Sequence, residues 1–280
     1  MAATQHLPAG NSDRFQELQN NVKQSLVSYW KSRKKVWETD QVTRHFSQYL
    51  VPVLARTQEQ KEAVFNIRHS VYCEELQYEP VRADQQEKDE FDSFSSFCLI
   101  NHKRTDTYAG TVRMVTPKEE GQLLPIEKYC LDTISHETLS PVNFRRDEIC
   151  EISRLAVPAD FRRRKADKFE GAATGGMPAT IYTEKEKRCF PLIAIGLYFA
   201  AAGLSNTSKR PHVFVMMEPR LARGMGYVGI KFQQIGPVVE YHGKRAPYYI
   251  NRNELEPGLE RGFKKMLRHI EGSILKQSKS

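Results

Sequence analysis

Hydrophobic and polar positions along the chain predict alternating helices and strands. From Phe15 to Trp30, apolar residues recur every three or four positions, which predicts an N-terminal helix after a short unpatterned tail. The apolar run 50–55 predicts the first strand of the main domain. Thr57 and Gln60 then match a capping box, so we expect a helix to begin there.

Further along the chain, strand patterns outnumber helix patterns. Two apolar runs flank a polar turn at 102–107, which predicts an antiparallel hairpin. The stretch 189–204 is almost wholly apolar and predicts a buried helix that is too short to span a membrane. Other expected elements are a short helix near 126–131, strands at 212–217, 232–235 and 246–250, and a short helix at 219–225. These elements together predict a mixed sheet flanked by helices.

Composition shifts divide the chain into segments. We expect a flexible tail and helical extension over 1–48, a main domain over 49–255, and a basic C-terminal helix and tail over 256–280. In the last segment, Phe263, Met266, Leu267, Ile270 and Ile274 give one apolar face, which favours packing on the domain over membrane anchoring. Within the main domain, 82–92 is a strongly charged loop. Residues 165–188 are poor in large apolar groups and are expected to form a mobile insertion.

The segment 148–165 combines a strand pattern with charged residues. Simple alternation places Glu151 and Ser153 on one face of the strand and Arg154 on the other, beside Cys150, which is expected in the core. Burying a lone charge costs several kcal/mol, so Glu151 and Arg154 should each be paired or face a cleft. Structural ion pairing and a site for chemistry on an anionic ligand are both consistent with this pattern.

Amino-acid composition limits the classes of binding partner and the compartment that we expect. Lys and Arg outnumber Asp and Glu by 42 to 34, a net charge of +8, which favours anionic partners. Few aromatic residues accompany the basic run at 161–165, which argues against nucleic acid. The five cysteines form no CxxC pair, so no zinc site is expected and a reducing compartment is favoured. Without a secretory leader pattern or an apolar span, we expect a cytoplasmic protein, with peripheral membrane contact left open.

Four short motifs in a fixed order carry a resemblance to a known family. They are Arg68 with Tyr72, the acidic stretch Asp89–Asp92, Gly110 with Arg113, and Glu151-Ile-Ser-Arg154. Over residues 50–250 this order resembles the GNAT acyltransferase superfamily. In particular it is similar to the branch of acyl-homoserine-lactone (autoinducer) synthases, N-acyl amino acid synthases and PEP-CTERM/exosortase-associated acyltransferases. The stretches 217–221 and 239–243 are most similar to the exosortase-associated group.

The resemblance implies a GNAT-like α/β (α+β) fold, with a largely antiparallel mixed sheet, flanking helices and an N-terminal helical extension. It also implies transfer of an acyl group from a phosphopantetheine thioester to an amine, with Glu151 as general base and arginines holding the acidic loop. The implied catalytic set is Glu151, Arg154, Arg113, Arg68, Asp89 and Asp92. The implied substrate-binding set is Tyr72, Phe91, Ser153, Leu155, Val157, Met217, Glu218 and His242. His242 is either a second proton-transfer group or a histidine that satisfies a local turn.

The acyl donor is predicted from a departure from the family pattern. Most GNAT enzymes place a glycine-rich turn after the Glu151 strand, where backbone N–H groups bind the pyrophosphate of CoA. Here Arg162, Arg163, Arg164 and Lys165 stand in that place. They favour a long-chain fatty acyl group carried by acidic acyl carrier protein, with no permanently bound cofactor and no metal. An acyl-CoA donor, a non-catalytic lipid- or anion-binding module and an exposed basic turn remain the alternatives.

Overall fold

The computed structural model describes residues 39–162, 182–241 and 243–279. The strands are β1 (Leu50–Leu54), β2 (Ser95–His102), β3 (Thr107–Val115), β4 (Ile149–Ala156), β5 (His212–Met217), β6 (Gln233–Gln234), β7 (Val239–Glu240) and β8 (Lys244–Asn251). The α-helices are α2 (Thr39–Tyr49), α3 (Gln58–Arg68), α4 (Pro125–Cys130), α5 (Glu184–Lys187), α6 (Pro191–Thr207), α7 (Pro219–Gly226), α8 (Arg252–Gly258) and α9 (Arg261–Lys279).

All the strands join one sheet in the order β1-β2-β3-β4-β5-β8-β6, with β7 also paired to β8. Every neighbouring pair is antiparallel except β4 and β5, which run parallel. This confirms the predicted fold class. The parallel ladder ends at the pair Glu151 and Phe214, although both strands continue. Beyond that pair, Ser153 of β4 and Met216 of β5 line a pocket.

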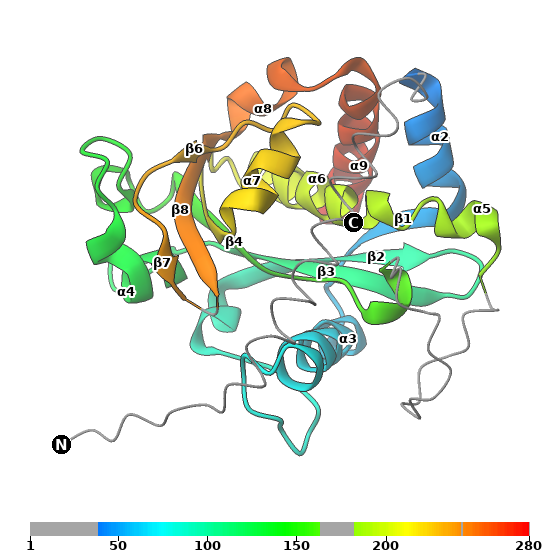
Figure 1. The fold of residues 1–280 in the computed structure, drawn as a ribbon, viewed down its shortest axis with the longest axis horizontal. Helices are drawn as coiled ribbons and strands as arrows, with labels where there is room; N and C mark the ends of the chain where they lie inside the picture. The colour runs from blue at the N-terminus through cyan, green and yellow to red at the C-terminus, as the bar shows by residue number, and fades with distance from the viewer. Residues whose placement is uncertain (1–38, 163–181, 242, 280) are drawn as a thin grey trace.

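Helices cover one face of the sheet with the largest core (Figure 1). The predicted apolar helix is α6, which is buried along nearly its whole length and packs on β2 and β3. The amphipathic helix α9 packs on α6, α2 and β1, and its five predicted apolar residues are all buried. The C-terminal segment therefore contributes to the same core as the sheet, as its apolar spacing predicts.

The opposite face carries two smaller apolar clusters with polar residues between them. One cluster packs α3 against β2 through Val64, Phe65, Phe97 and Leu99. The other packs α4 against β3, β4 and β5 and includes Val115, Ile126, Ile149 and Phe214. Since side chains alternate along a strand, Arg113 points to this face while Val112 and Met114 face α6. The charged site lies in the gap between the two clusters.

Several predicted segments differ in detail or lie outside the described residues. The charged loop 82–92 ends in a 3-10 helix, Glu90–Phe94, because the side chain of Asp89 caps its first turn. The strand expected at 232–235 shortens to β6. The helix expected over 15–30, the proposed insertion up to 181 and His242 fall outside the described ranges. None of the described helices has the length and apolar character to cross a bilayer.

Candidate functional site

A β-bulge in β4 places Arg154 in the site. Arg113 pairs with Ser153 and Thr111 with Ala156, so three residues of β4 lie opposite two of β3. Arg154 is at the bulge with φ of 50°, in the left-handed region that residues other than glycine seldom adopt. The bulge breaks the alternation of the strand. The prediction that Arg154 lies on the face opposite Glu151 and Ser153 is therefore wrong: all three line one pocket.

Tyr72 supports this irregular strand from the neighbouring helix. Helix α3 ends at Arg68 and continues as a π-helix, His69–Glu75, a widened turn that is frequent at functional sites. From this turn, the Tyr72 hydroxyl donates a hydrogen bond to the carbonyl oxygen of Leu155 at 2.8 Å. The guanidinium of Arg154 lies 5.6 Å from the centre of the Tyr72 ring. The π-turn and the bulge thus position each other.

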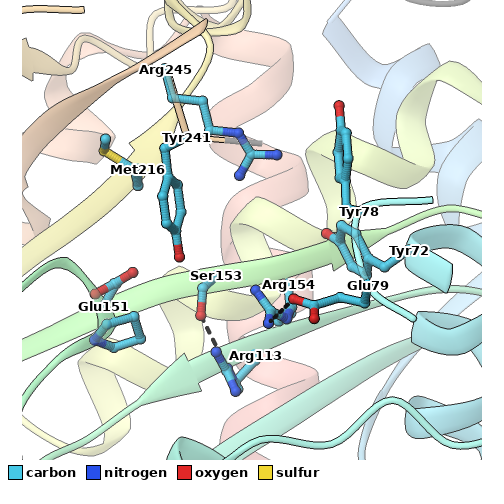
Figure 2. A pocket seen from close by; sticks show the side chains of 11 residues that line it. Tyr72, Tyr78, Glu79, Arg113, Glu151, Ser153, Arg154, Met216, Tyr241 and Arg245 are labelled. Atoms are coloured by element: carbon cyan, nitrogen blue, oxygen red, sulfur yellow. Dashed lines mark hydrogen bonds and ion pairs between the residues drawn. The ribbon is translucent and has the colours of Figure 1, made fainter. Parts of the chain in front are cut away.

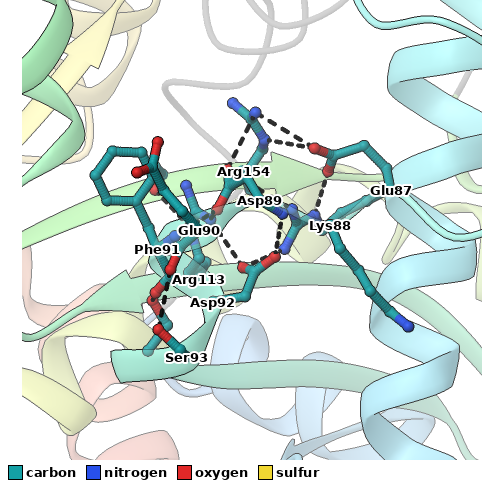
Figure 3. A network of polar contacts seen from close by, with 12 residues as sticks. Glu87, Lys88, Asp89, Glu90, Phe91, Asp92, Ser93, Arg113 and Arg154 are labelled. Carbon is teal, nitrogen blue, oxygen red and sulfur yellow. Dashed lines mark hydrogen bonds and ion pairs between the residues drawn. The ribbon is translucent and has the colours of Figure 1, made fainter.

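Three arginines and four buried or half-buried carboxylates form an ion network beneath the pocket (Figure 3). Arg68, which is fully buried, donates from Nε to Glu87 at 2.5 Å and from one terminal nitrogen to Asp92 at 2.7 Å. The other contacts are Arg113 with Asp89 at 2.5 Å and Asp92 at 2.8 Å, and Arg154 with Glu87 and Asp89 at 3.3 Å each and with Glu79 at 3.2 Å. Because each of the three arginines contacts at least two carboxylates, none of them is an uncompensated buried charge.

The network keeps Glu87 and Asp92 ionised. Burial raises the pKa of Glu87, but the hydrogen bond and charge of Arg68, with a contribution from Arg154, outweigh burial and lower that pKa below its usual value. Burial likewise raises the pKa of Asp92, and Arg68 and Arg113 bring it below the usual value. These groups are held as fixed ion pairs. They are not poised to exchange protons near neutral pH.

Glu151 has the opposite environment. Its side chain is buried, and it forms no ion pair with the arginines of the network. One oxygen, Oε2, accepts a hydrogen bond from the backbone N–H of Ile126 at 2.7 Å, and within the described part of the chain the other has no hydrogen-bond donor. Burial raises the pKa of Glu151 to about 8, although the Ile126 N–H and the charge of Arg113 oppose the rise. Glu151 can therefore exchange a proton in the neutral range.

Glu151 borders a pocket on the sheet face that carries the network (Figure 2). The pocket encloses about 490 Å³ of empty space, open solvent included. Its lining residues are Tyr72, Tyr78, Glu79, Arg113, Pro125, Glu151, Ser153, Arg154, Met216, Tyr241 and Arg245. The hydroxyl of Tyr241 points toward Ser153 and Glu151. Within residues 39–162, 182–241 and 243–279, no group of three His, Cys, Asp or Glu side chains could hold a metal ion.

The structure brings most of the predicted catalytic residues together. Arg113 and Arg154 connect the ion network to the pocket, where they meet Glu151, Ser153 and Tyr72. Ser153 accepts a hydrogen bond from Nε of Arg113 at 3.1 Å. Arg68, Asp89 and Asp92 lie below the pocket and do not line it.

Several predicted binding residues lie elsewhere. Met217 is buried in the large core, and its neighbour Met216 lines the pocket because successive residues of a strand face opposite sides. Phe91 is buried in the α4 cluster, whereas Leu155 and Val157 pack against the large core. Glu218 precedes α7 as its N-cap residue and does not line the pocket.

The basic run is described only in part. Arg162 forms an ion pair with Glu75, so its guanidinium already has an acidic partner within the chain. Arg163, Arg164 and Lys165 lie outside the described residues, as does His242. Their proposed roles remain predictions.

Several site residues were missed at the sequence level, among them Glu79, Glu87, Tyr241 and Arg245. Glu87 lies within the charged stretch 82–92 but outside the Asp89–Asp92 motif, so spacing alone did not distinguish it from exposed neighbours. Its backbone N–H donates to the carbonyl of Phe65, which holds it against α3. Arg245 belongs to a strand whose distance from β4 only the sheet order reveals.

The chain is similar in sequence to one family model and in structure to several proteins. Residues 67–170 match the model described as an acetyltransferase (GNAT) domain. The crystal structure of the AHL synthase LasI is 14% identical, with a TM-score of 0.51 over 76% of this chain and 97% of that one. TofI, solved in a ternary complex with an inhibitor and MTA, is 12% identical with a TM-score of 0.53, over 76% and 99% of the two chains.

A third similar structure is the CoA-dependent acyl-homoserine lactone synthase BjaI with SAM and isopentyl-CoA. It is 14% identical, with a TM-score of 0.51 over 83% of this chain and 99% of that one. No curated protein matches the sequence. At these identities, the structural similarities establish a shared fold.

Proposed function

We propose that the protein is an N-acyltransferase, because residues 67–170 match the GNAT acetyltransferase model and the fold is shared with acyl-homoserine-lactone synthases. It moves a long-chain acyl group from an acyl carrier protein thioester to the amine of an amino acid or a related small molecule. In this respect it is an N-acyl amino acid synthase or autoinducer-synthase-like enzyme, and its stretches 217–221 and 239–243 resemble the exosortase-associated group.

The observation that carries the proposal is the contrast between Glu151 and the other acids of the site. Glu87 and Asp92 are fixed by arginines, and their pKa values lie below the usual range. Glu151 borders the pocket, has one oxygen without a donor in the described chain, and has a pKa of about 8. A carboxyl group in that state is suited to accept a proton from an ammonium group near neutral pH.

The proposed reaction uses Glu151 as the base. Ionised Glu151 takes one proton from the ammonium of the acceptor, directly or through water, and leaves a lone pair on nitrogen. The nitrogen attacks the thioester carbon, so a C–N bond forms and the carbonyl oxygen takes the negative charge. Collapse of this intermediate breaks the C–S bond. The thiolate leaves and takes up a proton, the second amine proton is lost, and an amide and a free thiol are the products.

A second pocket is the proposed binding site for the acyl chain. It lies on the α6 side of the sheet, is lined mainly by apolar side chains, and encloses about 350 Å³, open solvent included. Ile152 and Val213 line it from β4 and β5, and Tyr198 lines it from α6.

Two donors are compatible with this arrangement. The basic run 162–165 in place of a glycine-rich turn favours acyl carrier protein, whose acidic surface it would attract. The ion pair of Arg162 with Glu75 leaves Arg163, Arg164 and Lys165 as the basic groups proposed for docking. Acyl-CoA is the second candidate, because the similar protein BjaI is CoA-dependent and was solved with isopentyl-CoA.

A donor comparison tests the function. The purified protein is incubated with a long-chain acyl group carried either by acyl carrier protein or by CoA, together with a panel of amino acids and amines. We expect mass spectrometry to detect N-acylated products, with acyl carrier protein as the better donor. Efficient turnover with acyl-CoA alone would favour the second candidate. Absence of N-acylated product with both donors would refute the proposal.

A further inference from the structure

Among the residues that the structure describes, Arg245 of the pocket has no acidic partner. It is half-buried on β8 and lines the same pocket as Glu151. Its Nε atom is buried and has no hydrogen-bond acceptor, and across the described residues no carboxylate pairs with its guanidinium. Its guanidinium carbon lies 5.8 Å from the centre of the Tyr78 ring, so it contacts an aromatic face.

The other arginines of the pocket are already occupied. Arg113 contacts two aspartates and Ser153, whereas Arg154 contacts two glutamates and an aspartate. A buried donor that lacks an acceptor costs free energy, and native structures seldom retain one without a reason. For Arg245, the open pocket in front of the guanidinium supplies that reason, because a ligand can bring the missing acceptor.

Arg245 and Glu151 stand on different walls of the pocket. β5 lies between their strands, and no ion pair or hydrogen bond joins the two side chains. Figure 2 shows the guanidinium of Arg245 extending over the space above Ser153 and Arg154, with Glu151 at the other side. The pocket therefore offers a site for an anion and, across it, a site for an ammonium.

We propose that Arg245 binds the carboxylate of the acceptor, so that the enzyme selects amino acids over amines that lack a carboxylate. This inference rests on the proposed function. One planar guanidinium donates two parallel hydrogen bonds to one carboxylate, which matches both the charge and the shape that Arg245 leaves unsatisfied. The ammonium of the same molecule lies toward Glu151. Arg245 acts in binding and takes no part in proton transfer.

The phosphate of the donor's phosphopantetheine is the other oxyanion that could reach the pocket. A phosphate group is usually held by several donors, among them backbone N–H groups, whereas the structure offers a single unpaired guanidinium here. We therefore assign Arg245 to the acceptor, and the experiment separates the two ligands.

The kinetic test compares each common amino acid with its primary amide, which keeps the amine and removes the carboxylate charge. For wild type we expect a higher kcat/KM with the free acid than with the amide. In Arg245→Gln we expect kcat/KM for the acid to fall about 10- to 100-fold, mainly through KM, while the amide changes little. Lys244→Gln is the matched control, because Lys244 is exposed on the same strand and should leave both values unchanged. Thermal unfolding verifies that each variant is folded.

A binding measurement separates this inference from the proposed function. Calorimetry with N-dodecanoylglycine and N-dodecanoylglycinamide needs no turnover, and glycine removes any side-chain preference. Tighter binding of the acid to wild type, lost in Arg245→Gln, supports the inference even if no acylation is found. Equal binding of the two ligands would overturn it. A rise in KM for the acyl donor, equal with both acceptors, would also overturn it and assign Arg245 to the donor phosphate.

Discussion

Replacing Glu151 by glutamine removes an ionisable group and keeps nearly the same shape. The side-chain oxygen of glutamine can still accept the hydrogen bond from the N–H of Ile126. The variant can no longer take up a proton. If Glu151 is the general base, kcat should fall by about 100- to 10,000-fold, the usual contribution of such a group. In the wild type, kcat/KM should rise with pH up to about 8 as Glu151 ionises. In Glu151→Gln, the part of this rise that comes from Glu151 should be absent.

The same substitution should change stability in a way that depends on pH. The carboxyl has a pKa near 4.5 when exposed and about 8 in the folded protein. Between these values the folded state holds a proton that the unfolded state has released, so folding stability falls as pH rises. At about 1.4 kcal/mol for each pH unit, the wild type should lose about 4 kcal/mol relative to Glu151→Gln between about pH 5 and about pH 9.

Urea unfolding of both proteins across this pH range measures the difference. Glu119→Gln removes an exposed glutamate instead and serves as the activity control, with turnover expected to match the wild type. If the stability curves of wild type and Glu151→Gln stay parallel from about pH 5 to about pH 9, the raised pKa of Glu151 is refuted. Unchanged turnover in Glu151→Gln across that range would refute its role as a base.

Three further substitutions test the scaffold of the site. Arg68→Met leaves two carboxylates short of a buried partner and should lower the free energy of unfolding by about 3–5 kcal/mol in urea; a loss below about 1 kcal/mol would contradict the network. Arg154→Gly relieves the positive φ and should be about 1 kcal/mol more stable than Arg154→Ala in the same assay; equal stability would argue against the bulge. Gly110→Ala would place a methyl 2.9 Å from the carbonyl oxygen of Ala156 and should cost about 1–3 kcal/mol in thermal unfolding, whereas a neutral result would contradict that close approach.

The elements with strong local patterns were predicted well. The capping box at Thr57, the hairpin of β2 and β3, the buried helix α6 and the amphipathic helix α9 all follow from spacing that a few neighbouring residues carry. The strand predicted at 232–235 shortens to β6, and β7 was not predicted, because each has two residues and depends on its pairing with β8. Short strands carry too little local pattern to be recognised before the sheet is assembled.

Site residues were predicted where a motif lies on one helix or strand. They were missed where the site depends on contacts between elements that are distant in sequence. Ordinary alternation along β4 puts Arg154 on the wrong face, because a bulge depends on the register with β3. Because side chains alternate along β5, Met216 lines the pocket in place of the predicted Met217, and only the orientation of β5 in the sheet shows this. Glu87 becomes part of the network through its contact with Arg68, which no spacing rule anticipates.

The sequence alone determined the elements and the chemical groups that this protein brings to its site. Periodicity depends on neighbouring residues, and the motifs around Arg68, Arg113 and Glu151 were legible for that reason. The tertiary structure decided which charged side chains form ion pairs with one another and which remain available to a ligand. Burial and ion pairing depend on groups that come from different elements. Only the folded chain therefore separates the proton-exchanging Glu151 from the fixed carboxylates. Among the described residues, it also leaves Arg245 without an acidic partner.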